Sequence, residues 1–146
     1  MLMPTEAPSL AAEILLLEQD AAQLAVFEEA TENNHLNIVG ECASILDFLR
    51  RQGTHSKAPR PDLILLDLDL SDKEGCEMLA GIKKDRQLKR IPVVVLAASE
   101  SYKDVFQAYD LHANAYICKP GDRGEFVKAL RATLHFWLAL ARLPRG

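Results

Sequence analysis

One run of the sequence constrains the fold more than any other. Residues 63–66 are Leu-Ile-Leu-Leu, apolar at every position, and Asp67 follows them directly. A strand that is apolar at consecutive positions is typically covered on both faces, so Asp67 is predicted to stand where this strand leaves the core. In an open parallel sheet, ligands bind at that end of the strands. The local composition leaves an alternative open, in which Asp67 and Asp69 are ordinary turn carboxylates.

Four further apolar runs accompany the central one, and a helical pattern follows each of them. The runs are residues 13–17, 36–39, 63–66, 93–98 and 115–118. Capping-box spacing predicts helix starts after Asp20, Ser101 and Asp122, and the first helix is expected to run from Ala21 to about Asn33. This alternation predicts a doubly wound α/β fold, in which five helices cover both faces of a five-stranded parallel sheet.

The composition excludes several classes of protein. With 146 residues, 49% of them hydrophobic and 26% charged, the chain has the size of one globular domain. We expect this domain to span residues 1–146, with a flexible tail at 1–12. The net charge of −4 argues against a nucleic-acid-binding surface. The three cysteines form no CxxC pair, which favours the cytoplasm, and no apolar run is long enough to cross a membrane.

The residues that follow the predicted strands include several acids and one lysine. They are Glu18, Gln19, Asp20, Asp67, Asp69, Ala97 and Lys119. Because the carboxyl ends of parallel strands meet at one edge of a sheet, the acids and the lysine are expected to face one another there. Clustered carboxylates favour a hard cation such as Mg²⁺, and a lysine can neutralise a phosphoryl oxygen. The chemistry implied is attack of the Asp67 carboxylate on phosphorus, which gives an acyl phosphate.

These residues also resemble those of a known family. Glu18, Asp67, Gly75 and the segment 116–120 (Tyr-Ile-Cys-Lys-Pro) look like the receiver domain of two-component response regulators, over nearly the whole chain. More narrowly, residues 46–53, 59–68, 90–96 and 136–138 are similar to the small single-domain regulators that partner bacterial phytochromes. The resemblance implies a flavodoxin-like fold with strand order 2-1-3-4-5, and a signalling role rather than an enzymatic one.

The resemblance also implies roles for single residues. Asp67 is expected to accept a phosphoryl group from the histidine of a sensor kinase, and Lys119 is expected to contact that group. Glu18, Gln19 and Asp67 are expected to hold Mg²⁺, and Asp69 to add its backbone carbonyl to the metal. A phytochrome-like kinase is the implied partner, together with a downstream protein that the sequence does not identify.

Gln19 departs from the family, because an acid is usual at this position. Its amide oxygen can ligate a metal but carries no charge, so we expect weak Mg²⁺ binding. Asp20 is one possible substitute, although its spacing also suits a helix cap. Asp69 can restore the charge as well, since residues two apart on a strand point the same way, but it can equally be a solvated loop acid.

Ala97 is a second departure, because the family places a serine or threonine there, whose hydroxyl bonds the phosphoryl group. Ser99 lies two residues further along and reaches the site only if the loop curls back. In the family, the aromatic residue at Tyr116 moves into the space that this hydroxyl vacates. With Ala97 that space can be open already, so we expect that Tyr116 need not report phosphorylation.

The last predicted helix, residues 122–143, is apolar on two sides. One stripe is expected to face the core of the chain itself, and the other needs a second cover. The residues expected to contact a second copy of the chain are Phe136, Trp137, Leu140 and Leu143. The resemblance favours this homodimer, and the alternative is that these residues fold back over their own domain.

Three hypotheses for the function follow. The first is a phosphorelay receiver without an output domain, and the second is a pseudo-receiver that signals by binding alone. The third is a haloacid-dehalogenase-type phosphatase, because residues 67–71 (Asp-Leu-Asp-Leu-Ser) also resemble the opening motif of that family. Two predicted strand-helix units precede this motif, and no Asp-Asp pair follows Lys119, which disfavours the phosphatase.

Overall fold

A central parallel sheet organises the chain, as the apolar runs predict. The computed structural model describes residues 11–31 and 33–144. Its five strands are β1 (Glu13–Leu17), β2 (His35–Val39), β3 (Leu63–Asp67), β4 (Val93–Ala97) and β5 (Ala115–Cys118). All neighbouring strands pair in parallel, in the order β2-β1-β3-β4-β5. The flavodoxin-like fold and its strand order are therefore confirmed.

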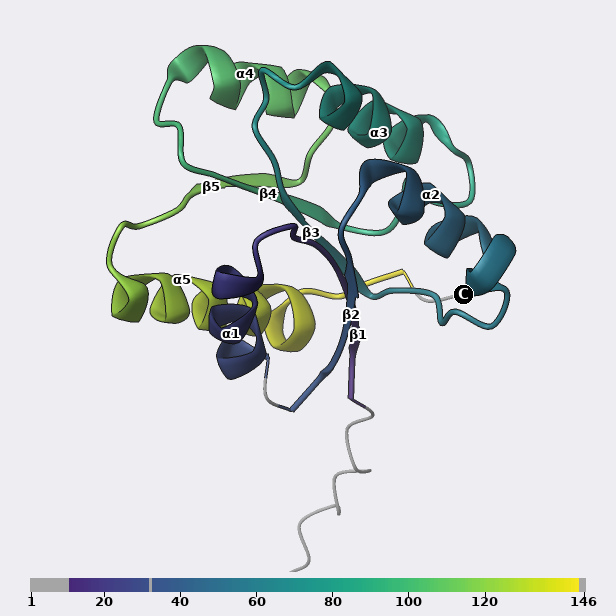
Figure 1. The fold of residues 1–146 in the computed structure, drawn as a ribbon, viewed down its shortest axis with the longest axis horizontal. Helices are drawn as coiled ribbons and strands as arrows, with labels where there is room; N and C mark the ends of the chain where they lie inside the picture. The colour runs from purple at the N-terminus through teal and green to yellow at the C-terminus, as the bar shows by residue number, and fades with distance from the viewer. Residues whose placement is uncertain (1–10, 32, 145–146) are drawn as a thin grey trace, which may run out of the picture.

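Helices cover both faces of this sheet (Figure 1). They are α1 (Ala21–Ala30), α2 (Cys42–Arg50), α3 (Lys73–Lys84), α4 (Tyr102–Asp110) and α5 (Arg123–His135), with a short 3-10 turn, η1 (Gly53–His55). Helices α1 and α5 pack on one face, where Phe27 and Phe126 meet edge to face with ring centroids 5.6 Å apart. Helices α2, α3 and α4 lie on the other face.

Strand β3 is buried on both sides, which explains its uninterrupted apolar sequence. Leu63 and Leu65 enter the core beneath α1 and α5, whereas Ile64 and Leu66 enter the core beneath α2, α3 and α4. All four side chains are fully buried. Burial of one such side chain contributes about 1.5–3 kcal/mol, so β3 is a firm support for Asp67 at its end.

Side-chain caps fix the starts of the helices around the carboxyl edge of the sheet. Asp20, Ser101 and Asp122 accept hydrogen bonds from the backbone N–H groups of Ala22, Lys103 and Glu125, as the capping spacing predicts. Asp72 caps α3 in the same way. The predicted end of the first helix at Asn33 is wrong, because α1 ends at Ala30. There the hydroxyl of Thr31 bonds back to the carbonyl of Phe27 and closes the last turn.

The C-terminal helix is shorter than the predicted range of 122–143. After α5 the chain continues as a π-helix, η2 (Phe136–Leu140), and becomes extended at Ala141. Ala141 N–H donates to the carbonyl of Phe136, which closes the final wide turn. Pro144 disfavours helical geometry at the residue before it, so Leu143 stands outside the helix and lines a hollow beside the chain's own loops at residues 60–62 and 90–92.

The four predicted dimer residues therefore differ in their surroundings. Phe136 and Leu140 are 49% and 64% exposed. Trp137 packs partly against the core beneath α1 and α5, with its ring edge to face against Phe136. For Trp137 and Leu143, folding back over the same domain accounts for much of their apolar surface, whereas Phe136 and Leu140 keep theirs on the outside.

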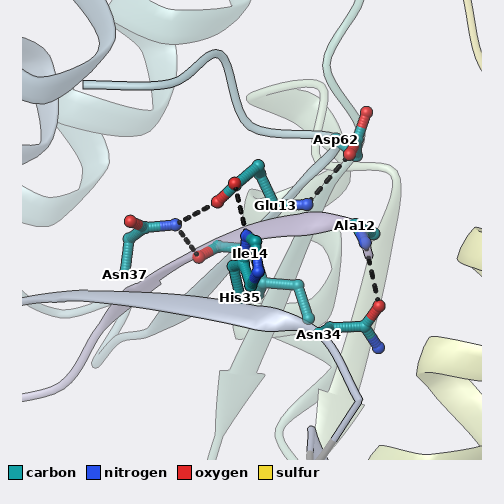
Figure 2. Close-up of polar contacts among 7 residues, drawn as sticks. All are labelled: Ala12, Glu13, Ile14, Asn34, His35, Asn37 and Asp62. Atoms are coloured by element: carbon teal, nitrogen blue, oxygen red, sulfur yellow. Dashed lines mark hydrogen bonds and ion pairs between the residues drawn. The ribbon is translucent and has the colours of Figure 1, made fainter. Parts of the chain in front are cut away.

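Polar side chains join the amino ends of β1 and β2, opposite the edge at which Asp67 lies (Figure 2). The carboxylate of Glu13 receives Asn37 Nδ2 at 3.0 Å and lies 2.7 Å from His35 Nδ1. The backbone N–H of Glu13 donates to Asp62 Oδ2 at 2.9 Å. Asn37 Nδ2 also donates to the carbonyl of Ile14. This network fixes the edge strand to the sheet through matched donors and acceptors.

The start of the chain departs in part from the predicted flexible tail at 1–12. Residues 1–10 lie outside the described residues. Ala12 is buried, its N–H donates to Asn34 Oδ1, and its carbonyl accepts from the N–H of His35. Ala12 is thus held by the edge of the sheet rather than belonging to a tail. No helix in the described residues is long and apolar enough to cross a membrane.

Candidate phosphoryl-acceptor site

Asp67 and Lys119 meet at the carboxyl edge of the sheet. Lys119 Nζ lies 2.8 Å from each carboxylate oxygen of Asp67, although the two residues are 52 positions apart. Both side chains are largely buried, with 13% of Asp67 and 16% of Lys119 exposed. The N–H of Lys119 donates to the carbonyl of Ala97 at 2.7 Å, which ties the lysine to the end of β4. The predicted adjacency of this acid and this lysine is confirmed.

Glu18 adds a second carboxyl group to the site. It follows β1 directly, is 6% exposed, and its backbone N–H donates to the carbonyl of Val39. Burial raises the pKa of Glu18 to about 8, and the hydrogen bond and the negative charge of Asp67 act in the same direction, while Lys119 opposes them. Glu18 therefore holds a proton more readily than an ordinary glutamate, and in its protonated form it can donate to Asp67.

The remaining predicted metal ligands have other surroundings, and their role stays a prediction. Gln19 is exposed, and Asp20 caps α1, so the alternative of a helix cap holds for Asp20. The side chain of Asp69 accepts hydrogen bonds from the N–H and the hydroxyl of Ser71, which lower its pKa. The backbone carbonyl of Asp69 accepts from the N–H of Asp72. The carboxylates of Asp20 and Asp69 are thus each engaged by a backbone N–H group two residues further along the chain.

The donor set still fits Mg²⁺, although it is sparse. In the part of the chain that the structure describes, no three acidic, histidine or cysteine side chains are grouped to hold a metal. Mg²⁺ commonly keeps several waters and binds through one or two carboxylates, which Glu18 and Asp67 can provide. Such binding must displace the proton of Glu18 and share Asp67 with Lys119.

A cavity of about 420 Å³ opens beside the pair. It is lined by Asp67, Leu68, Asp69, Leu70, Ala97, Ala98, Ser99 and Lys119. The cavity combines one acid that can act as a nucleophile with one cation that can neutralise an incoming anion. The sequence alone did not single out Leu68, Leu70 or Ala98, and their only signal is their place next to the strand ends.

Gly75 allows α3 to approach the loop that follows β3. A Cβ atom at this position would lie 3.0 Å from Leu68 Cδ2, closer than side chains normally pack. Leu68 is buried, and its N–H donates to the carbonyl of Leu96 in β4. A side chain at residue 75 would therefore push on the residue next to Asp67.

Tyr116 is turned toward the loop between β4 and α4. Its hydroxyl donates to the carbonyl of Ser99 at 2.6 Å, and burial raises its pKa. Its backbone N–H donates to the hydroxyl of Tyr109 at 3.3 Å. Ala97 is 2% exposed and presents only a methyl group at the end of β4. The predicted switch pair, Ala97 and Tyr116, thus lies beside the cavity, and its switching role stays a prediction.

Comparison with known proteins identifies close relatives. Residues 14–131 match the response regulator receiver domain family. The response regulator Rcp1 of Synechocystis is 40% identical over 135 residues, which cover 90% of this chain and 92% of Rcp1.

Solved structures give the same result. The crystal structure of the phosphorylated cyanobacterial phytochrome response regulator RcpA is 40% identical, with a TM-score of 0.86, and the match covers 93% of this chain and 100% of RcpA. The Mn²⁺-bound form of Rcp1 is 38% identical, with a TM-score of 0.84 over 92% of this chain and 99% of that one.

Proposed function

The chain belongs to the response regulator receiver family, and we propose that it is a single-domain response regulator that accepts a phosphoryl group on Asp67 from a sensor histidine kinase. Members of this family are signalling regulators rather than enzymes. One observation carries the proposal: Lys119 Nζ lies 2.8 Å from both oxygens of Asp67, at the mouth of an open cavity. The similarity to the phytochrome response regulator RcpA favours a phytochrome-type kinase as partner.

The transfer assigns one role to each member of the pair. A carboxylate oxygen of Asp67 forms a bond to phosphorus while the bond between phosphorus and the kinase histidine nitrogen breaks, and the imidazole keeps that electron pair. The product is an acyl phosphate on Asp67. The ammonium group of Lys119 neutralises charge on a phosphoryl oxygen, in a site largely shielded from water.

Mg²⁺ is the proposed cofactor, and its binding is weak. Glu18 and Asp67 would hold it, with the amide oxygen of Gln19 and the backbone carbonyl of Asp69 as further ligands. When bound, it supplies positive charge against the phosphoryl oxygens. The proton on Glu18 and the missing charge at Gln19 are the reasons to expect a low affinity.

A pseudo-receiver that signals by binding alone is a second candidate. Ala97 has no hydroxyl to bond a phosphoryl group, and the hydroxyl of Tyr116 is bonded to the carbonyl of Ser99, which favours a loop conformation that does not depend on phosphorylation. The haloacid-dehalogenase hypothesis is not favoured, because the family match is to receiver domains. In addition, Asp69, its required general acid, is bonded to the N–H and the hydroxyl of Ser71.

The proposed partners include a second copy of this chain. Phe136 and Leu140 lie four residues apart and are 49% and 64% exposed, so they offer an apolar face for pairing. Trp137 and Leu143 flank that face and would be covered further in a homodimer. We also propose a cytoplasmic location, where a sensor kinase and a downstream protein are both accessible.

Intact-mass spectrometry with a small phosphodonor tests the proposal. Incubation with acetyl phosphate and Mg²⁺ is expected to add the mass of one phosphoryl group to the protein and none to the Asp67→Asn variant. Asp110→Asn, which changes an exposed acid at the end of α4, is the matched control and should still gain the mass. Absence of the added mass at saturating donor would favour the pseudo-receiver.

A further inference from the structure

A phosphoryl group on Asp67 needs hydrogen-bond donors on more than one side. Its terminal oxygens share the negative charge, and Lys119 can serve only those on its own side of the cavity. The wall formed by the end of β4 presents Ala97 and then Ala98, neither of which has a side-chain donor. A charged group next to this wall would lose hydration without a replacement.

Ser99 is the one hydroxyl-bearing residue that lines this cavity. The loop curls so that Ser99 shares the cavity with Asp67 and Lys119, although it lies two residues beyond the end of β4. Its Oγ accepts a hydrogen bond from the N–H of Ser101 at 3.1 Å. A serine hydroxyl has one proton and two lone pairs, so this bond uses acceptor capacity and leaves the proton available for an anion.

Tyr116 holds Ser99 at the cavity. Its hydroxyl donates to the carbonyl of Ser99 at 2.6 Å, and its own backbone N–H is bonded to the hydroxyl of Tyr109. Tyr116 and Ser99 lie 17 residues apart in sequence, so this contact ties β5 to the loop that carries Ser99. The curl of the loop therefore has an anchor outside the loop itself.

We propose that Ser99, held in place by Tyr116, supplies the hydroxyl donor to the phosphoryl group on Asp67 that Ala97 lacks. The inference rests on the proposed function, because it concerns the ligand of the same cavity. It makes Ser99 a binding residue for the phosphoryl group and Tyr116 a positioning residue, in place of a switch that responds to phosphorylation.

Beryllium trifluoride, a non-hydrolysable mimic of the phosphoryl group, tests this assignment. Its affinity for the protein in saturating Mg²⁺ can be measured by fluorine NMR. A hydrogen bond to a charged group is lost in Ser99→Ala, so we expect about tenfold weaker binding. Ser99→Thr keeps a hydroxyl and should stay within about threefold of the wild type. Tyr116→Phe removes only the anchoring hydroxyl and should lie between the two.

Testing Ser99→Ala in a protein that also carries Ala97→Ser distinguishes a hydrogen-bond donor from a residue that only shapes the loop. Ala97→Ser introduces a hydroxyl on the wall that lacks one, so in that background Ser99→Ala should cost little affinity. Ser101→Ala is the control, because its side chain caps α4 and does not line the cavity. It should bind the mimic within about twofold of the wild type.

The outcomes separate this inference from the function on which it rests. Wild-type binding together with an unchanged affinity in Ser99→Ala would overturn the role of Ser99 and leave the phosphoryl-acceptor function standing. A tenfold loss that persists in the Ala97→Ser background would do the same, because Ser99 would then act through the shape of the loop. A wild-type protein that does not bind the mimic would overturn both.

Discussion

Strand β1 has a glutamate at each end, and the two carboxyl groups behave in opposite ways. Glu13 begins the strand, and although burial alone would raise its pKa, hydrogen bonds from Asn37 and His35 hold that pKa below its usual value. Glu18 follows the strand, and burial together with Asp67 raises its pKa to about 8. Two glutamates only five positions apart, one at each end of β1, thus differ: the carboxylate is stabilised by its neighbours at the amino end and destabilised by them at the carboxyl end.

The difference separates a structural network from a functional site. At the amino end, donors and acceptors satisfy one another and need nothing further (Figure 2). At the carboxyl end, Glu18 and Asp67 approach each other beside a single lysine and an open cavity. Clustering of like charges costs stability, and it is retained where a cation or an anionic group is to be bound.

The largest effect is expected from a substitution in the core, which supports both ends of the sheet. Leu65→Ala empties part of the core beneath α1 and α5 and should lower the free energy of unfolding by about 2–5 kcal/mol, measured by urea denaturation. Tyr102→Ala is the control, because this side chain is 80% exposed, and should cost less than about 0.5 kcal/mol. Equal losses for both variants would contradict the assignment of the core.

The next effect acts on the carboxyl end alone. Lys119→Met removes the cation from Asp67 and should slow phosphoryl uptake from acetyl phosphate about a hundredfold or more, followed by intact mass. Lys84→Met, at the exposed end of α3, keeps the fold and the site and should react like the wild type. An unchanged rate in Lys119→Met would remove the lysine from the proposed chemistry.

A smaller effect acts on the amino end. Asn37→Ala removes the hydrogen bonds to Glu13 and to the carbonyl of Ile14, and should lower the free energy of unfolding by about 1 kcal/mol. Because the site is at the other end of the sheet, the rate of phosphoryl uptake should not change. A variant with normal stability and impaired uptake would show that the two ends are not independent.

The last expected effect is a difference in pH dependence. The pKa of Glu18 is raised, so its contribution to the stability of the metal-free protein is present below its ordinary value of 4.5 and is lost as pH rises toward about 8. The pKa of Glu13 is lowered, so its contribution is present above 4.5 and is lost on acidification. The free energy of unfolding, measured by urea denaturation, can be plotted against pH for each variant. Glu18→Gln should flatten this curve between pH 5 and 8, whereas Glu13→Gln should flatten it only on the acid side of 4.5. If both variants flatten the curve in the same pH range, the contrast between the pKa values of Glu13 and Glu18 is contradicted.

Local patterns were sufficient to predict the framework. The unbroken apolar run before Asp67 predicted a strand buried on both faces, and the spacing after Asp20, Ser101 and Asp122 predicted three helix caps. Parallel topology then implied that Asp67 and Lys119 would meet, because both follow strands that end at the same edge. These features depend on residues close in sequence or on the direction of the strands.

Features that depend on side-chain orientation were not accessible from the sequence. The bond between the Glu13 N–H and Asp62 joins residues 49 positions apart and has no pattern. The turn of Asp69 toward Ser71 and the curl that brings Ser99 to the cavity depend on loop geometry. The end of the last helix at Leu140 was missed because its apolar stripe continues to Leu143, while the proline that follows sets a conformational limit.

Carbon-13 NMR titration of the glutamate carboxyl groups in the metal-free protein tests the contrast most directly. The account predicts that Glu18 titrates near pH 8 and that Glu13 titrates below its ordinary value of 4.5. A Glu18 signal that titrates at or below 4.5 would contradict it, because the carboxyl edge of the sheet would then be as well matched as the amino edge.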